Sequence, residues 1–127
     1  MTLRCVIVDD SPAVRRAARD LLGREGVAVV GLAATADEAA RLVHDQRPDV
    51  VLVDIDLGAD SGFALARRLA TCGGGGEARS ILMSTRAEAD YADLIAASPA
   101  VGFLSKSDLS ATAIRRLLSD AGEAIDY

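Results

Sequence analysis

The stretch PDVVLVD, residues 48–54, decides the fold of this chain. Its four consecutive apolar residues, 50–53, follow a helix-breaking proline and end at an aspartate, Asp54. An uninterrupted apolar run of this length is typical of a strand buried on both faces of a parallel sheet. We therefore interpret 50–53 as a central strand with Asp54 at its carboxyl end.

Further apolar runs and helical patterns alternate on either side of this strand. Each strand-like run is followed by a segment with helical spacing of its apolar residues, which predicts five β-α units. The expected fold class is doubly wound α/β, with helices on both faces of a parallel sheet of flavodoxin-like strand order 2-1-3-4-5. The other expected strands are 4–8, 27–33, 81–83 and 101–104, and the later helices are 63–69, 88–97 and 111–121.

The first two helices carry recognisable start and stop signals. Ser11 and Pro12 are typical of an N-cap and a first helical residue, and Gly26 is suited to end that helix. Thr35, with Glu38 three residues later, resembles a capping box. The pair Pro48-Asp49 ends the second helix, directly before the central strand.

The composition describes a small acidic domain. The chain has 127 residues, half of them hydrophobic, which suits a single domain over residues 1–127 with one aliphatic core. The net charge of −5 argues against direct nucleic-acid binding, which depends on Lys and Arg. No apolar stretch is long enough to span a membrane, and Asp9-Asp10 interrupts the apolar start, so we expect a cytoplasmic protein. Cys5 and Cys72 fit neither a disulfide framework nor a metal site, and Cys5 is expected to be buried.

Polar residues gather at the expected carboxyl ends of the strands, where doubly wound folds bind their ligands. Carboxylates brought together at that edge repel one another, and Mg²⁺ would offset the repulsion. A cation, an aspartate, a hydroxyl and an ammonium group together favour phosphoryl transfer to a carboxylate. The residues concerned are Asp9, Asp10, Asp54, Asp56, Ser84, Thr85 and Lys106.

These residues lie in four motifs that resemble the receiver domain of two-component response regulators. The motifs are residues 6–11, 48–54, 81–84 and 102–106, and the similarity runs from about Arg4 to Leu118. The resemblance implies that Asp54 is the phosphoacceptor and that Ser84 and Lys106 contact the phosphoryl group. It implies a Mg²⁺ site formed by Asp9, Asp10, Asp54 and the backbone carbonyl of Asp56.

The resemblance also implies a switch and a set of partners. Ser84 would move toward the phosphoryl group and Phe103 would rotate inward, changing the face formed by helix 88–97, strand 101–104 and helix 111–121. The implied phosphate donor is a sensor histidine kinase. A homodimer through that face, and an output domain or partner protein with a transcriptional role, are further expectations.

Five residues depart from the usual receiver pattern. Leu57-Gly58 replaces the common Met-Pro, which suggests a looser loop. Thr85 is larger than the usual small residue, and we expect it to slow the loss of phosphate by hindering water. Ser107 replaces a common proline, as in receivers that precede a helix-turn-helix output domain, and Phe103 lacks the hydroxyl of the commoner tyrosine.

Two other functions fit part of the sequence. The chain could be a pseudo-receiver, a protein-binding module that never carries phosphate. Asp54-Ile55-Asp56 also resembles the nucleophile motif of haloacid-dehalogenase-type phosphatases, although that family places the motif on its first strand.

His44 is expected to face solvent without a role, and the glycine run 73–76 to form a loop.

Overall fold

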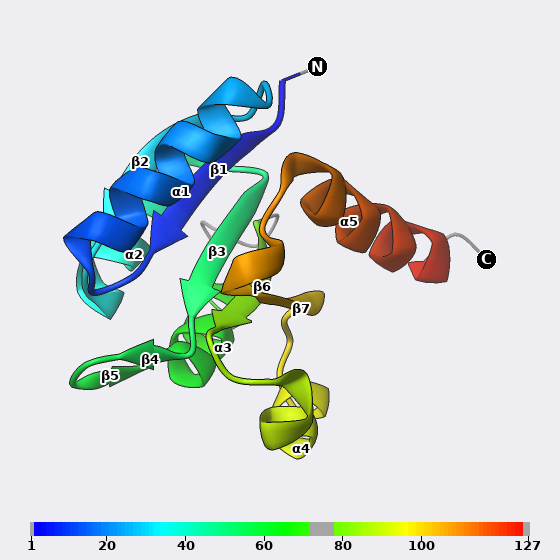
Figure 1. Cartoon of the computed structure of the whole chain (residues 1–127). Helices are drawn as coiled ribbons and strands as arrows, with labels where there is room; N and C mark the ends of the chain where they lie inside the picture. The colour runs from blue at the N-terminus through cyan, green and yellow to red at the C-terminus, as the bar shows by residue number, and fades with distance from the viewer. Residues whose placement is uncertain (1, 72–77, 126–127) are drawn as a thin grey trace.

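A parallel five-stranded sheet forms the centre of the protein. The computed structural model describes residues 2–71 and 78–125, with side chains up to residue 120. The order of the strands is β2-β1-β3-β6-β7 (Figure 1). Because β4 and β5 form a separate hairpin, this is the predicted order 2-1-3-4-5. The strands of the sheet are β1 (Arg4–Val8), β2 (Ala28–Ala33), β3 (Val50–Asp54), β6 (Arg79–Ser84) and β7 (Gly102–Ser105).

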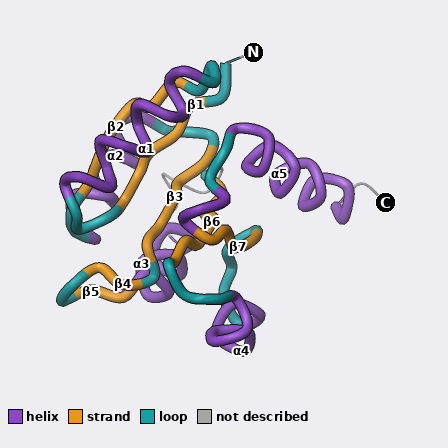
Figure 2. The backbone as a smooth tube through the Cα atoms, viewed as in Figure 1, coloured by secondary structure: helices purple, strands orange, loops and turns teal. Residues whose placement is uncertain are grey.

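Helices cover both faces of the sheet, as expected for parallel strands (Figure 2). One face packs against α1 and α5, and the opposite face packs against α2 and α3. The helices are α1 (Pro12–Arg24), α2 (Ala36–Gln46), α3 (Gly62–Thr71), α4 (Ala92–Ala96) and α5 (Ala111–Ile125).

The side chains of each strand alternate between two apolar cores. In β1, Cys5 and Ile7 pack with α1 and α5, whereas Val6 and Val8 pack with α2 and α3. All four of these side chains are fully buried. Burial raises the pKa of the Cys5 thiol to about 12, which agrees with its expected role as a small core residue.

The helix starts predicted from the sequence are confirmed. Ser11 Oγ accepts a hydrogen bond of 3.3 Å from the Val14 N–H, with Pro12 as the first residue of α1. Thr35 Oγ1 accepts a hydrogen bond of 3.2 Å from the Glu38 N–H at the start of α2. The Glu38 carboxylate accepts from the N–H of Ala34 rather than of Thr35, so the capping box is displaced by one residue.

Two segments differ from the expectation. Residues 56–61, expected to be a loose loop, form a hairpin of β4 (Asp56–Leu57) and β5 (Asp60–Ser61). Gly58 has a φ of +64° at its turn, and Leu57 is buried, which explains why this segment is ordered. The expected helix 88–97 is a 3₁₀ turn, η2 (Glu88–Tyr91), followed by the single short helix α4. Neither of these two elements contains a buried residue, in keeping with the weak amphipathicity of the segment.

Three remaining expectations concern single features. His44 is exposed on α2, as predicted. Cys72 and the glycine run 73–76 lie outside the described residues. Within residues 2–71 and 78–125, no helix is long and apolar enough to cross a membrane.

Candidate functional site

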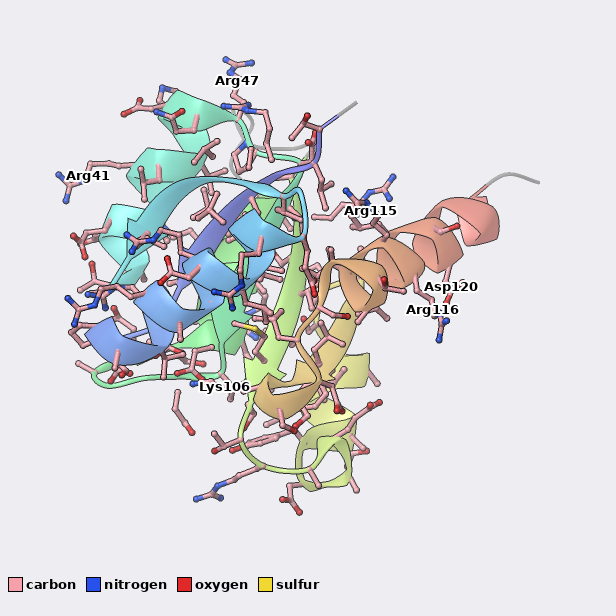
Figure 3. The ribbon with its side chains drawn as sticks, turned by 45° about the horizontal axis from the view of Figure 1, so that its top comes forward. Arg41, Arg47, Lys106, Arg115, Arg116 and Asp120 are labelled. Carbon is pink, nitrogen blue, oxygen red and sulfur yellow. The ribbon has the colours of Figure 1, made fainter. Side chains whose placement is uncertain are left out.

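A lysine from the far end of the chain lies between two carboxylates at the carboxyl edge of the sheet. Lys106 Nζ is 2.7 Å from Asp9 Oδ2 and 3.2 Å from Asp54 Oδ2. The lysine is in η3 (Lys106–Asp108), directly after β7, while Asp9 directly follows β1 and Asp54 ends β3. Figure 3 shows its side chain extending from η3 toward the start of α1. Lys106 is the only lysine in the sequence.

Asp9 is the most enclosed member of the cluster. Its exposed fraction is 0%, and both of its carboxylate oxygens are hydrogen-bonded. Oδ1 accepts 2.9 Å from the Ser11 N–H, and Oδ2 accepts from Lys106. A buried carboxylate is stable only with such partners, so Asp9 is held in a defined orientation.

Asp10 completes a group of three carboxylates. Asp9, Asp10 and Asp54 each offer one oxygen atom, and these atoms lie within 4.8 Å of one another. Asp10 is exposed, whereas the other two are buried. A Cβ on Gly58 would approach Asp10 Oδ2 to 3.4 Å, so the turn of the β4–β5 hairpin lies directly against this carboxylate.

The carboxyl group of Asp54 is poorly stabilised as an anion. Burial, and next the negative charge of Asp9, raise its pKa above the ordinary value, while Lys106 and the Asp56 N–H offset only part of this effect. The hydrogen bond from the Asp56 N–H to Asp54 Oδ1 is 3.2 Å long. At Lys106, burial acts to lower the pKa, but the hydrogen bond to Asp9 and the charges of Asp54 and Asp9 outweigh it, so the pKa is raised. The site therefore has excess negative charge despite its lysine.

The remaining residues singled out from the sequence lie around this cluster. Ser84 ends β6, next to β3 in the sheet; it is buried, and its Oγ accepts 3.0 Å from the Arg86 N–H. Phe103 is half-buried in β7, opposite Leu82, and packs against the core that lies between the sheet and helices α2 and α3. Asp56 is the first residue of the hairpin, and its side chain is exposed.

Two residues at the site were not anticipated from the sequence. The Gly62 N–H donates 2.9 Å to the Ile55 carbonyl, and a Cβ on Gly62 would lie 2.3 Å from the Asp54 carbonyl oxygen, so only glycine lets α3 begin here. The Arg15 guanidinium donates 2.6 Å to the Asp9 backbone carbonyl. Arg15 precedes the buried residues Ala18 and Leu22 by three and seven positions, which is a helical spacing that could have revealed its inward position.

The donor atoms at this edge fit a hard divalent cation. Carboxylate oxygens from Asp9, Asp10 and Asp54 converge, and Mg²⁺ prefers oxygen ligands. The described residues offer no thiolate or imidazole at this position that would favour a softer metal. The group also has the excess negative charge that a cation would neutralise.

Comparisons with known proteins identify the family of the chain. The family model "Response regulator receiver domain" matches residues 5–118. A putative transcriptional regulator from Pseudomonas aeruginosa is 30% identical over 105 residues, which are 83% of this chain and 50% of that protein. The chain thus spans half or less of the length of the first curated relatives it matches.

Solved structures give the same result. A LuxR-family two-component response regulator from Aurantimonas sp. SI85-9A1 is 31% identical, with a TM-score of 0.82, over 97% of this chain and 87% of that one. A response regulator from Burkholderia pseudomallei, described with a phosphorylated aspartic acid, a calcium ion and citrate, is 25% identical, with a TM-score of 0.80, over 96% of this chain and 70% of that one. Since the family model covers nearly the whole chain and the fold agrees, this protein belongs to the response regulator receiver domain family.

Proposed function

We propose that this receiver domain accepts a phosphoryl group on Asp54 in a Mg²⁺-dependent reaction, with a sensor histidine kinase as the donor. The observation that carries the proposal is the position of Asp54 between an ammonium group and two further carboxylates. Lys106 Nζ lies 3.2 Å from Asp54 Oδ2, and one oxygen each of Asp9, Asp10 and Asp54 lie within 4.8 Å of one another. Phosphoryl transfer depends mainly on positioning and charge stabilisation, which such a group can supply.

In the proposed reaction a carboxylate oxygen of Asp54 attacks the phosphorus atom. The P–N bond of a phosphohistidine breaks as the P–O bond to Asp54 forms, and the imidazole leaves with the bonding electron pair and takes up a proton. Lys106 can compensate charge on the phosphoryl oxygens, and the Ser84 hydroxyl can donate a hydrogen bond to one of them.

Bound Mg²⁺ would neutralise charge on the carboxylates and on the phosphoryl group, with Asp9, Asp10, Asp54 and the Asp56 carbonyl as its protein ligands. Of these, Asp9 would support the metal through a water molecule, because both of its carboxylate oxygens already accept hydrogen bonds. Asp10 is exposed and adjacent, which suits a direct ligand.

The proposed output is a change of surface rather than turnover of a substrate. A Ser84 hydroxyl drawn to the phosphoryl group would give up its hydrogen bond from the Arg86 N–H, which starts the segment leading to α4. Phe103 lies on the neighbouring strand and is half-buried, so inward rotation would alter the face of α4, β7 and α5. We propose a transcriptional role for this face, because one relative is described as a putative transcriptional regulator.

We further propose that residues 1–127 form one receiver domain that works with an output domain or a partner protein, and that it is not an enzyme acting on separate substrates. A homodimer through α4, β7 and α5 and a cytoplasmic location are part of the same proposal. The phosphatase alternative is not favoured, since Asp54 ends the third strand along the chain and the receiver model matches residues 5–118.

The experiment is incubation with Mg²⁺ and acetyl phosphate, followed by intact-mass measurement, beside an Asp54→Asn variant. Gain of one phosphoryl mass by the wild type alone would support the proposal, and omission of Mg²⁺ should prevent the gain. If neither acetyl phosphate nor a panel of phosphorylated histidine kinases modifies a folded protein, the pseudo-receiver alternative replaces the proposal.

A further inference from the structure

We propose that Arg15 is a positioning residue for the metal site, holding the turn that carries Asp9 and Asp10. This inference rests on the proposed function, because it assigns Mg²⁺ to these carboxylates. It starts from the hydrogen bond of 2.6 Å that Arg15 Nη1 donates to the Asp9 backbone carbonyl.

The turn between β1 and α1 is held at Asp9 by several independent contacts. The Asp9 N–H donates 3.0 Å to the Ala33 carbonyl of β2, which fixes the turn to the sheet. Asp9 Oδ1 accepts from the Ser11 N–H, which closes the turn over Asp10. The carbonyl of Asp9 lies past the end of β1, and Arg15 supplies its hydrogen-bond donor. The backbone of Asp10 is therefore fixed from both neighbours while its side chain stays exposed.

The position of Arg15 on α1 differs from that of the other arginines nearby. Arg15 is half-buried, in line with the buried residues Ala18 and Leu22, whereas Arg16 and Arg19 are exposed. A hydrogen bond from a charged donor is stronger than one between two neutral groups. Arg15 is thus placed to stabilise one conformation of the turn, and Arg16 is not.

A positioning role and a purely electrostatic role have opposite consequences for metal binding. A positive charge near the carboxylates repels Mg²⁺, so removal of Arg15 would tighten metal binding if charge alone mattered. Loss of a group that orients the ligands instead weakens metal affinity, typically by about 10–100-fold. The sign of the change therefore separates the two roles.

The test is a calorimetric titration of the full chain with MgCl₂ alone, carried out on wild type, Arg15→Met and Arg16→Met. Both variants lose one positive charge from adjacent positions of the same helix. We expect about tenfold weaker Mg²⁺ binding in Arg15→Met and unchanged or slightly tighter binding in Arg16→Met. Arg15→Lys, which keeps a charged donor, should recover part of the lost affinity.

Equal or tighter binding in Arg15→Met than in Arg16→Met would overturn the inference. Far-UV circular dichroism and urea unfolding verify that each variant is folded during the titration, and Arg15→Gln replaces Arg15→Met if the latter is not. An Asp10→Asn variant separates this inference from the proposed function. If wild type binds Mg²⁺ no better than Asp10→Asn, the metal site itself fails, and the assignment of Arg15 is rejected with it.

Discussion

Lys106 donates a hydrogen bond of 2.7 Å to Asp9, a residue 97 positions earlier in the chain. This contact is shorter than the 3.2 Å between Lys106 and Asp54. Asp9 is fully buried, so the ammonium group of the lysine stabilises its carboxylate in place of the hydration that an exposed carboxylate receives. Lys106 is therefore paired with a buried supporting carboxylate as well as with the proposed phosphoacceptor.

Replacement of Lys106 by Met should destabilise the metal-free protein. The change leaves an oxygen of Asp9 without its donor and exposes Asp54 to the uncompensated charge of Asp9, with an expected loss of about 1–3 kcal/mol in the free energy of unfolding. Urea denaturation measures the loss, and Arg16→Met controls for the removal of one exposed positive charge. Equal stability of the two variants would contradict the assigned role of Lys106. Saturating MgCl₂ should recover part of the lost stability, because it supplies positive charge to the same carboxylates.

Replacement of Asp54 by Asn should stabilise the protein near neutral pH. The pKa of Asp54 is raised in the folded state, first by burial and then by Asp9, so the ionised form is less favourable in the folded than in the unfolded chain. This cost is present above the folded-state pKa and disappears as the pH falls below the unfolded value of about 3.9. The advantage of Asp54→Asn should therefore shrink from pH 7 toward pH 4, as measured by denaturation across that range. Asp45→Asn, at an exposed position of α2, is the control for the removal of one carboxylate charge.

A methyl group at position 62 should severely disturb the site. The Cβ of Gly62→Ala would lie 2.3 Å from the Asp54 carbonyl oxygen and 2.8 Å from the Ile55 Cα, which are backbone atoms that cannot rotate away. We expect a loss of about 3 kcal/mol in the free energy of unfolding. Gly23→Ala is the matched control, because a Cβ there meets nothing within 4 Å inside α1, and it should gain about 0.5–1 kcal/mol. A small effect at both positions would mean that the start of α3 can shift away from Asp54.

Replacement of Thr85 by Ala should shorten the lifetime of phosphorylated Asp54. Thr85 is exposed directly after Ser84, so its methyl and hydroxyl groups can hinder water that approaches the phosphoryl group. We expect the rate of phosphate loss to increase by less than tenfold, which corresponds to a lowering of the activation barrier by less than about 1.4 kcal/mol. The rate is measured by the decay of the phosphorylated mass after the donor is removed. Thr112→Ala, at an exposed position of α5, is the control, and equal decay in all three proteins would refute the role of Thr85.

The β4–β5 hairpin could not be predicted from the local sequence pattern. Gly58 indicated conformational freedom, but that freedom is used in a tight turn with φ +64° rather than in a loose loop. The burial of Leu57 stabilises the turn, and Leu57 belongs to a core cluster that includes Val8 and Leu82, which are distant from it in the chain. The segment 88–97 was expected to be one weakly amphipathic helix. It forms a 3₁₀ turn over Glu88–Tyr91 and an α-helix only over Ala92–Ala96, because weak amphipathicity supports little α-helix.

The sequence by itself determined the class of fold and the identity of the polar groups at the sheet edge. Continuous apolar strands such as Val50–Asp54 require cover on both faces, and alternating helices provide it, so Asp9, Asp54 and Lys106 had to meet at one edge. The tertiary structure alone decided how these groups pair. A few ångströms decide whether Lys106 bonds to Asp9 or only to Asp54. Distances of the same size decide whether Arg15 reaches the Asp9 carbonyl and whether Gly62 can approach Asp54. Side-chain packing sets such distances, because local sequence patterns specify direction and period but not the separation of residues that are distant in the chain.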